Sequence, residues 1–150
     1  MSNPSEATEI VELIRRSREA GDFNILTDAI PYMKFLGIET AIEEGTITTT
    51  MRYSRRLIGN VHLPALHGGT IGALLETAAI VQLAHDLDTA HLPKTIGITV
   101  EYMRTGRPID LHAKAVVTKR GRRVANMRAV AWSDNPDKPV ATAHGHFLLS

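Results

Sequence analysis

The sequence contains no cysteine, few aromatic residues and almost no excess of charge of either sign. The absence of cysteine excludes disulfides, thiolate metal sites and cysteine nucleophiles. Lysine and arginine number 17 against 16 acidic residues, which gives a net charge of +1. Nucleic-acid-binding proteins usually carry a strong basic excess, and binding of single strands uses aromatic stacking platforms. With aromatic residues at 5%, no nucleic-acid partner is expected.

Long apolar runs are also missing, because Glu76 interrupts the longest one. The first 20 residues are polar and contain no apolar leader segment. We therefore expect a cytoplasmic protein without a membrane partner. The chain does have 150 residues with a 43% hydrophobic fraction, which is enough for one globular domain with its own core. We expect residues 1–150 to form that single domain, with residues 1–35 as a helical extension.

Hydrophobic periodicity divides the chain into helical and extended parts. Apolar residues at helical spacing predict a first helix that is capped by Asn3, begins at Pro4 and stops at Gly21. A short helical piece is expected over 25–29. From Leu36 the period changes to two, which predicts strands over 37–42 and 46–53, a turn at 43–45 and a loop over 54–66.

The second half of the chain begins with a segment that is apolar on nearly every side. Residues 68–87 predict a buried helix, because only a surface helix needs a polar face. Four strands are expected after it, over 94–104, 109–120, 122–133 and 139–149, with a hairpin turn at Gly121. The order of elements predicts an α+β fold in which one long helix packs on a mostly antiparallel sheet of five to six strands.

Glu76 lies in the middle of the predicted buried helix, where a carboxylate is costly unless it is paired or hydrogen-bonded. Its neighbours three and four residues away are Gly72, Ala73, Ala79 and Ile80, and none of them can pair with it. One interpretation is a helix stripe that reaches solvent or a structural ion pair. The other is a general base or nucleophile.

The start of the same helix carries a second unusual group, His67-Gly68-Gly69. Two glycines leave backbone N–H groups uncovered at a helix N-terminus, where they can stabilise an oxyanion. The pair can also be a simple tight turn. Gly68 and Glu76 are eight residues apart, roughly 12 Å along a helix. If both act on one carbonyl, the site must lie between two subunits whose helices run antiparallel.

Basic and histidine residues form two further groups. Lys119, Arg120, Arg122 and Arg123 surround the Gly121 turn, and Arg104 lies at another strand end. Such a group is either a solubilising surface or a clamp for phosphates. His144 and His146 are two residues apart on a predicted strand, so their side chains share one face of the sheet. We expect that face to be polar. Because no third ligand has a suitable position, we expect no metal site.

The segment Leu66-His67-Gly68-Gly69-Thr70-Ile71-Gly72-Ala73-Leu74-Leu75-Glu76-Thr77-Ala78 resembles the signature of hotdog-fold acyl-CoA thioesterases of the phenylacetate-degradation (PaaI-like) type. The shared pattern is His-Gly-Gly, an acid nine residues after the histidine, and then small residues. The resemblance covers residues 36–149. It implies a long helix wrapped by an antiparallel sheet, in a homodimer or homotetramer with the active site between subunits.

The resemblance also implies roles for individual residues. Glu76, a glutamate where many relatives have aspartate, would be the catalytic carboxylate. A backbone N–H at Gly68 or Gly69 would polarise the thioester carbonyl, with His67 beside it. Thr95 falls where a serine or threonine holds the attacking water or the thioester. The hairpin residues and Arg104 would bind CoA, together with Asn60, which is one residue before the position of the family asparagine, here Val61.

The resulting hypothesis is hydrolysis of an acyl-CoA thioester, with CoA as part of the substrate and no other cofactor. Glu76 would either activate water or attack the carbonyl itself. Two alternatives remain open, an acyl-CoA hydratase or dehydratase and a non-catalytic module that binds acyl-CoA. The sequence leaves the acyl group and the role of the N-terminal helix open.

Overall fold

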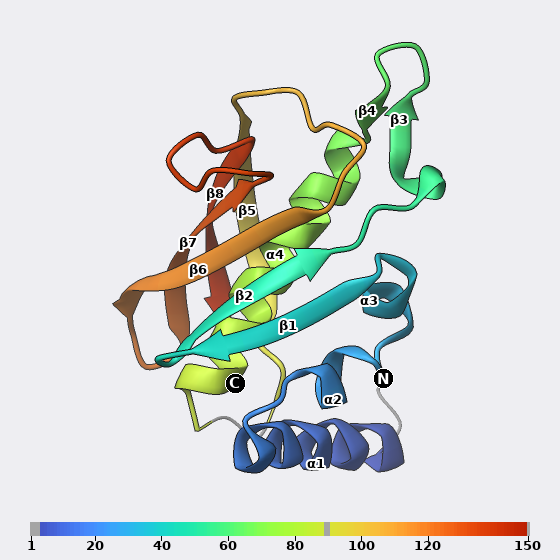
Figure 1. Ribbon diagram of the computed structural model, residues 1–150. Coiled ribbons are helices and arrows are strands. Elements are labelled where there is room, and N and C mark those ends of the chain that lie inside the picture. The colour runs from blue at the N-terminus through green and yellow to red at the C-terminus, as the bar shows by residue number, and fades with distance from the viewer. Residues whose placement is uncertain (1–3, 89–90, 150) are drawn as a thin grey trace.

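The computed structural model describes residues 4–88 and 91–149, and in it a curved sheet wraps around one long helix (Figure 1). The sheet has six strands in the order β1-β2-β6-β7-β8-β5, and every neighbouring pair is antiparallel. The helix is α4, Gly68–Asp86. This is the hotdog arrangement of the α+β class, as predicted.

Helix α4 forms the centre of the core because its side chains are apolar in almost every direction. Leu74, Leu75, Val81 and Leu83 are fully buried. The main hydrophobic cluster joins α4 to the inner face of the sheet. The only strongly polar side chain buried in α4 is Gln82 (counting the described residues), which accepts from the N–H of Ile47 at 2.9 Å and donates to the carbonyl of Gly45 at 3.1 Å.

The first two strands, β1 (Ile38–Glu43) and β2 (Thr46–Met51), form the predicted hairpin. Its turn places Glu44 and Gly45 at φ 49° and 78°, the left-handed region that a two-residue hairpin turn requires. Along β2, every second residue is buried. The alternation of burial along β2 agrees with the period of two in the sequence.

The four later strands also lie where they were predicted. They are β5 (Lys94–Tyr102), β6 (Leu111–Arg120), β7 (Val124–Trp132) and β8 (Ala141–Leu148). Strands β6, β7 and β8 alternate between buried and exposed residues, because one face covers α4. Strand β5 is an outer strand and is mostly exposed. Its register with β8 shifts between Thr95 and Gly97.

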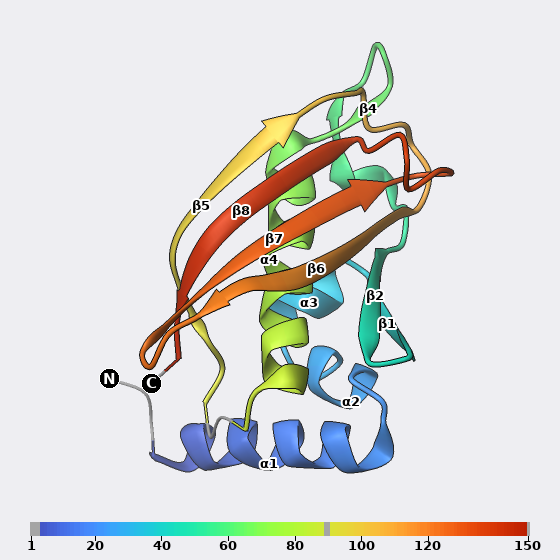
Figure 2. The same cartoon turned by 90° about the vertical axis from the view of Figure 1, so that its left-hand side faces the viewer.

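The N-terminal extension crosses the end of the molecule where α4 finishes (Figure 2). It contains α1 (Pro4–Ala20), α2 (Asn24–Thr27) and α3 (Pro31–Phe35). Arg18 fastens α1 to α4 by donating to the carbonyls of Ala84 and Leu87. Helix α3 was not predicted, although proline suits the first position of a helix. The expected cap, Asn3, lies outside the described residues.

The segment expected to be a loop, residues 54–66, is more regular than predicted. It holds a 3-10 turn, η1 (Arg55–Leu57), and a small hairpin of β3 (Ile58–Asn60) and β4 (Ala65–Leu66). Gly59 lets this hairpin approach the main chain, since a Cβ there would lie 2.6 Å from the Cα of His67. None of the helices in the described ranges is long and apolar enough to cross a membrane.

Candidate functional site

Glu76 lies on the one stripe of α4 that the sheet does not cover. The partly exposed residues of the stripe recur at helical spacing, and they are Gly72, Ala73, Glu76 and Ile80. Glu76 itself is half-buried, and it forms no hydrogen bond or ion pair within the described residues. Of the two structural alternatives, the stripe that reaches solvent is therefore correct and the ion pair is not. The carboxylate is accessible to a ligand that binds along α4.

At the start of α4, His67 caps the helix with its own side chain. Its Nδ1 accepts a hydrogen bond from the N–H of Gly69 at 2.8 Å. A neutral imidazole that accepts at Nδ1 carries its proton on Nε2, so His67 presents an N–H donor on its outer side. The cap also means that the N–H of Gly69 is already used. Sequence reasoning had treated the two glycine N–H groups as equivalent, and the structure distinguishes them.

Gly68 keeps its N–H free, since no acceptor for it lies within the described part of the chain. Tyr102 covers the other side of this turn, where its hydroxyl donates to the carbonyl of Gly68 at 2.6 Å. A Cβ on Gly68 would lie 3.3 Å from the tyrosine ring. The missing side chain therefore allows Tyr102 to pack against the first turn of α4. Gly68 is the better placed of the two glycines to bind an oxyanion.

Thr95 and Asn60, both expected near the substrate, lie on different elements. Thr95 is partly exposed near the start of β5, where it pairs with Phe147. Asn60 ends β3, and its Oδ1 accepts from the N–H groups of His62 and Leu63 at 3.0 and 3.2 Å. This side-chain oxygen therefore holds the β3–β4 turn. Within the described residues, neither forms a hydrogen bond with Glu76.

The basic residues expected to bind CoA fall into two separate groups. Lys119, Arg120, Arg122 and Arg123 are exposed at the β6–β7 turn, which adjoins the start of β5, because Leu148 pairs with both Val124 and Lys94. Arg104 follows the other end of β5 and donates to the carbonyl of Pro139 at 2.7 Å. The length of β5, about 30 Å, separates the groups within one chain.

Outside the candidate site, the charged groups around Arg52 form a network with a structural role. Asp110 accepts from the N–H of Tyr53 and from Arg52, both at 2.7 Å. The backbone N–H of Tyr53, and then the Arg52 guanidinium, hold the pKa of Asp110 below its usual value. Arg52 also binds Glu39, which joins β1 to the loop before β6. No group of three possible metal ligands occurs among residues 4–88 and 91–149, and His144 and His146 are exposed on β8.

Two residues that position the site were missed by sequence reasoning. No motif in the sequence linked Tyr102 to Gly68. Gln82 was overlooked within its apolar surroundings. A single amide side chain in an apolar helix indicates a buried group that forms hydrogen bonds. Both residues anchor α4, Tyr102 at its first turn and Gln82 near its end.

Comparisons with known proteins agree with the fold and identify the family. The family model of the thioesterase superfamily matches residues 63–140. A solved structure of a protein from Chromobacterium violaceum is 35% identical, with 91% of this chain and 96% of that chain covered and a TM-score of 0.75. A comparison with curated proteins finds no match.

Two more distant structures share the fold. A phenylacetic acid degradation-related protein from Ralstonia eutropha is 19% identical, with 91% of this chain and 98% of that chain covered and a TM-score of 0.74. A protein from Bacillus halodurans, solved with CoA, is also 19% identical, with 100% and 96% covered and a TM-score of 0.74. The family match spans the start of α4, Glu76 and strands β5 to β7. This chain belongs to the thioesterase superfamily and has its hotdog fold.

Proposed function

We propose that the protein hydrolyses acyl-CoA thioesters. The observation that carries this proposal is the state of Glu76, a half-buried carboxylate without a partner on the open stripe of α4. A carboxylate with no structural contact, in a member of a thioesterase superfamily, is available for chemistry. The Bacillus halodurans structure with CoA supports CoA as the carrier of the acyl group.

In the proposed reaction, the oxygen of water bonds to the acyl carbon and the carbon–sulfur bond breaks. The departing sulfur takes a proton, so the products are a free acid and CoA. Glu76 either removes a proton from the attacking water or forms a transient anhydride that water then opens. The N–H of Gly68 binds the oxyanion, and such a donor contributes about 3 to 4 kcal/mol to the transition state. Thr95 would hold the water or the thioester.

The site requires a second copy of the chain, because Gly68 and Glu76 lie about 12 Å apart along one helix. Strand β5 is an open edge of the sheet, and its exposed residues include Ile96 and Tyr102. A second copy docked there with its α4 antiparallel would place its Gly68 next to Glu76. The same pairing would bring the Arg104 of one copy toward the hairpin residues of the other. Lys119, Arg120, Arg122, Arg123 and Asn60 would then contact CoA.

The first test is thiol release from acetyl-, octanoyl-, dodecanoyl- and phenylacetyl-CoA by the wild type and Glu76→Ala. We expect turnover by the wild type and a loss of about 10² to 10⁴-fold in the variant. Enoyl-CoA hydration is measured in parallel, because hydration without thiol release would indicate a hydratase. Binding of CoA esters without any turnover would indicate a binding module and contradict the proposal.

A complementation experiment tests whether the site lies between subunits. Gly68→Pro removes the N–H at a helix position that tolerates proline, and Gly68→Ala keeps the N–H as its matched control. Glu76→Ala and Gly68→Pro should each be inactive. Unfolded and refolded together, they should recover about a quarter of wild-type activity, since half the dimers are mixed and each has one intact site. Recovery of nothing would place the whole site within one chain.

A further inference from the structure

The N-terminal helix α1 does more than cover the end of the sheet, because it forms one wall of a hollow. The hollow has a volume of about 470 Å³ and lies between the first turns of α1, the segment that precedes β5 and the end of β8. Residues 4–20 of α1 lie outside the part of the chain that matches the superfamily model. The hollow therefore depends on the N-terminal extension, which the superfamily model does not cover.

The walls of the hollow are mostly apolar. Ala7 and Ile10 contribute from α1, Leu92 and Pro93 from the segment before β5, and Leu148 from β8. The polar side chains Glu6, His91 and Lys94 complete the lining. A concave apolar site of this size with a few polar groups is typical of a small-molecule pocket. Its chemistry suits a hydrocarbon chain rather than a sugar, a nucleotide or a phosphate.

The hollow adjoins the last turns of α4 and the start of β5, the two elements that carry Glu76 and Thr95. Ile10 and Leu92 pack against the second hydrophobic cluster, which contains Val81 and Ala84 of α4. Ala84 lies two turns beyond Glu76, about 12 Å along the helix axis. Ile80, partly exposed on the same stripe as Glu76, lies between them. On β5, Lys94 of the hollow directly precedes Thr95 of the candidate site.

We propose that this hollow receives the far end of the substrate's acyl chain, so that α1 selects long acyl groups. The inference rests on the proposed thioesterase function and names its substrate class. An acyl group bound at Glu76 must extend along two turns of α4 before it reaches Ala7 and Leu92. Acetyl and butanoyl groups are too short to do so. An extended octanoyl group is also shorter than this distance, whereas a dodecanoyl group exceeds it and buries its last methylene groups in the hollow.

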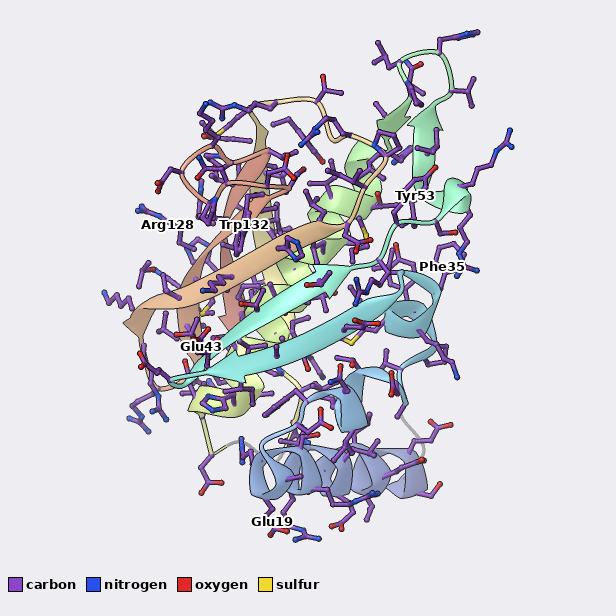
Figure 3. All side chains as sticks on the ribbon, in the orientation of Figure 1. Glu19, Phe35, Glu43, Tyr53, Arg128 and Trp132 are labelled. Atoms are coloured by element: carbon purple, nitrogen blue, oxygen red, sulfur yellow. The ribbon has the colours of Figure 1, made fainter. Side chains whose placement is uncertain are left out.

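Ala7→Phe tests this inference because it fills the hollow from α1. Its matched control is Ala20→Phe, the same change at the exposed last residue of α1. Figure 3 shows the neighbouring Glu19 projecting away from the body of the protein. Thermal unfolding confirms that each variant is folded, and Ala7→Leu is a milder substitute if Ala7→Phe is not. The measured quantity is kcat/KM for butanoyl-, octanoyl- and dodecanoyl-CoA.

Each methylene group that loses its apolar site lowers affinity about fourfold. We therefore expect Ala7→Phe to lower kcat/KM for dodecanoyl-CoA more than tenfold and to leave octanoyl-CoA and butanoyl-CoA unchanged. Ala20→Phe should keep the wild-type profile. An Ala7→Phe profile that falls equally for every chain length, or does not change, would overturn the inference.

Binding of free dodecanoate, measured by titration calorimetry, separates this inference from the proposed function. The wild type and Ala20→Phe should bind dodecanoate, and Ala7→Phe should bind it more than tenfold more weakly. If no CoA ester is hydrolysed but this binding pattern is found, the pocket is correct and the thioesterase assignment fails. If short CoA esters are hydrolysed while dodecanoate does not bind the wild type, the assignment holds and the pocket is wrong.

Discussion

The two edges of the sheet are built in opposite ways. At the β1 edge, the side chain of Asn24 from α2 bonds both backbone groups of Thr40, at 2.8 Å to its N–H and 3.0 Å to its carbonyl. The exposed side chains of β1 include two acids, Glu39 and Glu43. At the β5 edge, no other strand of the described chain pairs beyond β5. Its exposed side chains include Ile96, at 60%, and Tyr102, at 54%.

An exposed edge strand invites pairing with another chain, and proteins usually block it with charge or cover it. Both edges carry exposed charges, since β5 has Lys94 and Glu101. The β1 edge is in addition blocked by Asn24, whereas the β5 edge is left open beside the uncovered stripe of α4 that carries Glu76. In the proposed dimer, β1 faces solvent and β5 is the edge at which the second copy of the chain docks. The following predictions test this asymmetry.

The largest effect is expected for the carboxylate beside the open edge. Glu76→Gln should lower kcat for the best CoA ester by about 10² to 10⁴-fold, because the amide can neither accept the proton of water nor attack. Glu39→Gln, the same change at the blocked edge, should stay within about twofold of the wild type. The measurement is steady-state thiol release. Equal losses in both variants would mean that the two edges do not differ in function.

A lysine introduced on either edge strand should change the oligomeric state only where that edge forms the proposed interface. Ile96→Lys puts an ammonium group in the centre of the proposed interface, where an unpaired buried charge is strongly unfavourable. We expect this variant to be a monomer by light scattering and to lose turnover with the dimer. Ala41→Lys, on an exposed position of β1, should keep the wild-type mass and activity. A monomeric Ala41→Lys would reverse the assignment of the edges.

Unblocking the β1 edge should cost stability without affecting the reaction. Asn24→Ala removes the side chain that bonds to both backbone groups of Thr40, and we expect a loss of about 1 to 3 kcal/mol in the free energy of unfolding. Urea denaturation measures the change. Turnover per folded molecule should remain that of the wild type. A loss of activity larger than the loss of folded protein would indicate that α2 contributes to the site.

The smallest effect concerns Asp110, whose partner Arg52 also binds Glu39 on the blocked edge. Its pKa is lower in the folded chain than its ordinary value of 3.8. The associated stability is therefore fully present above about pH 4 and is lost as the pH falls through the folded-state pKa. Because the site is largely exposed, Asp110→Asn should cost less than about 1 kcal/mol at pH 7. In urea denaturation the difference from the wild type should shrink at pH 3.

Most of the fold could be predicted because its large elements repeat a simple pattern. Helix α4 is apolar on nearly every side, and burial along β2 alternates strictly. In both elements the burial in the structure therefore matches the hydrophobic period of the sequence. The β3–β4 hairpin was missed because strands of three and two residues are too short to show alternation. Helix α3 was missed for a similar reason, since it has only five residues. In both cases tertiary contacts hold a segment whose local signal is weak.

The candidate site was predictable in its residue types and not in its contacts. Glu76 was identified because a carboxylate in an apolar helix needs an explanation, but its lack of a partner depends on which stripe the sheet leaves open. The capping of Gly69 by His67 depends on one rotamer, which no spacing rule specifies. The packing of Tyr102 on Gly68 joins residues 34 positions apart, a relationship that requires the folded topology.

The bonds of Arg18 have a consequence for the order in which the newly made chain can acquire its structure. Its two acceptor carbonyls lie 66 and 69 residues later in the sequence. At about 5 to 20 residues per second, synthesis of that distance takes about 3 to 14 s. An isolated helix of this length is only marginally stable in water. Helix α1 leaves the ribosome before α4 and is thus among the last parts of this domain to become fixed, and its apolar stripe is exposed to chaperones until α4 has been made.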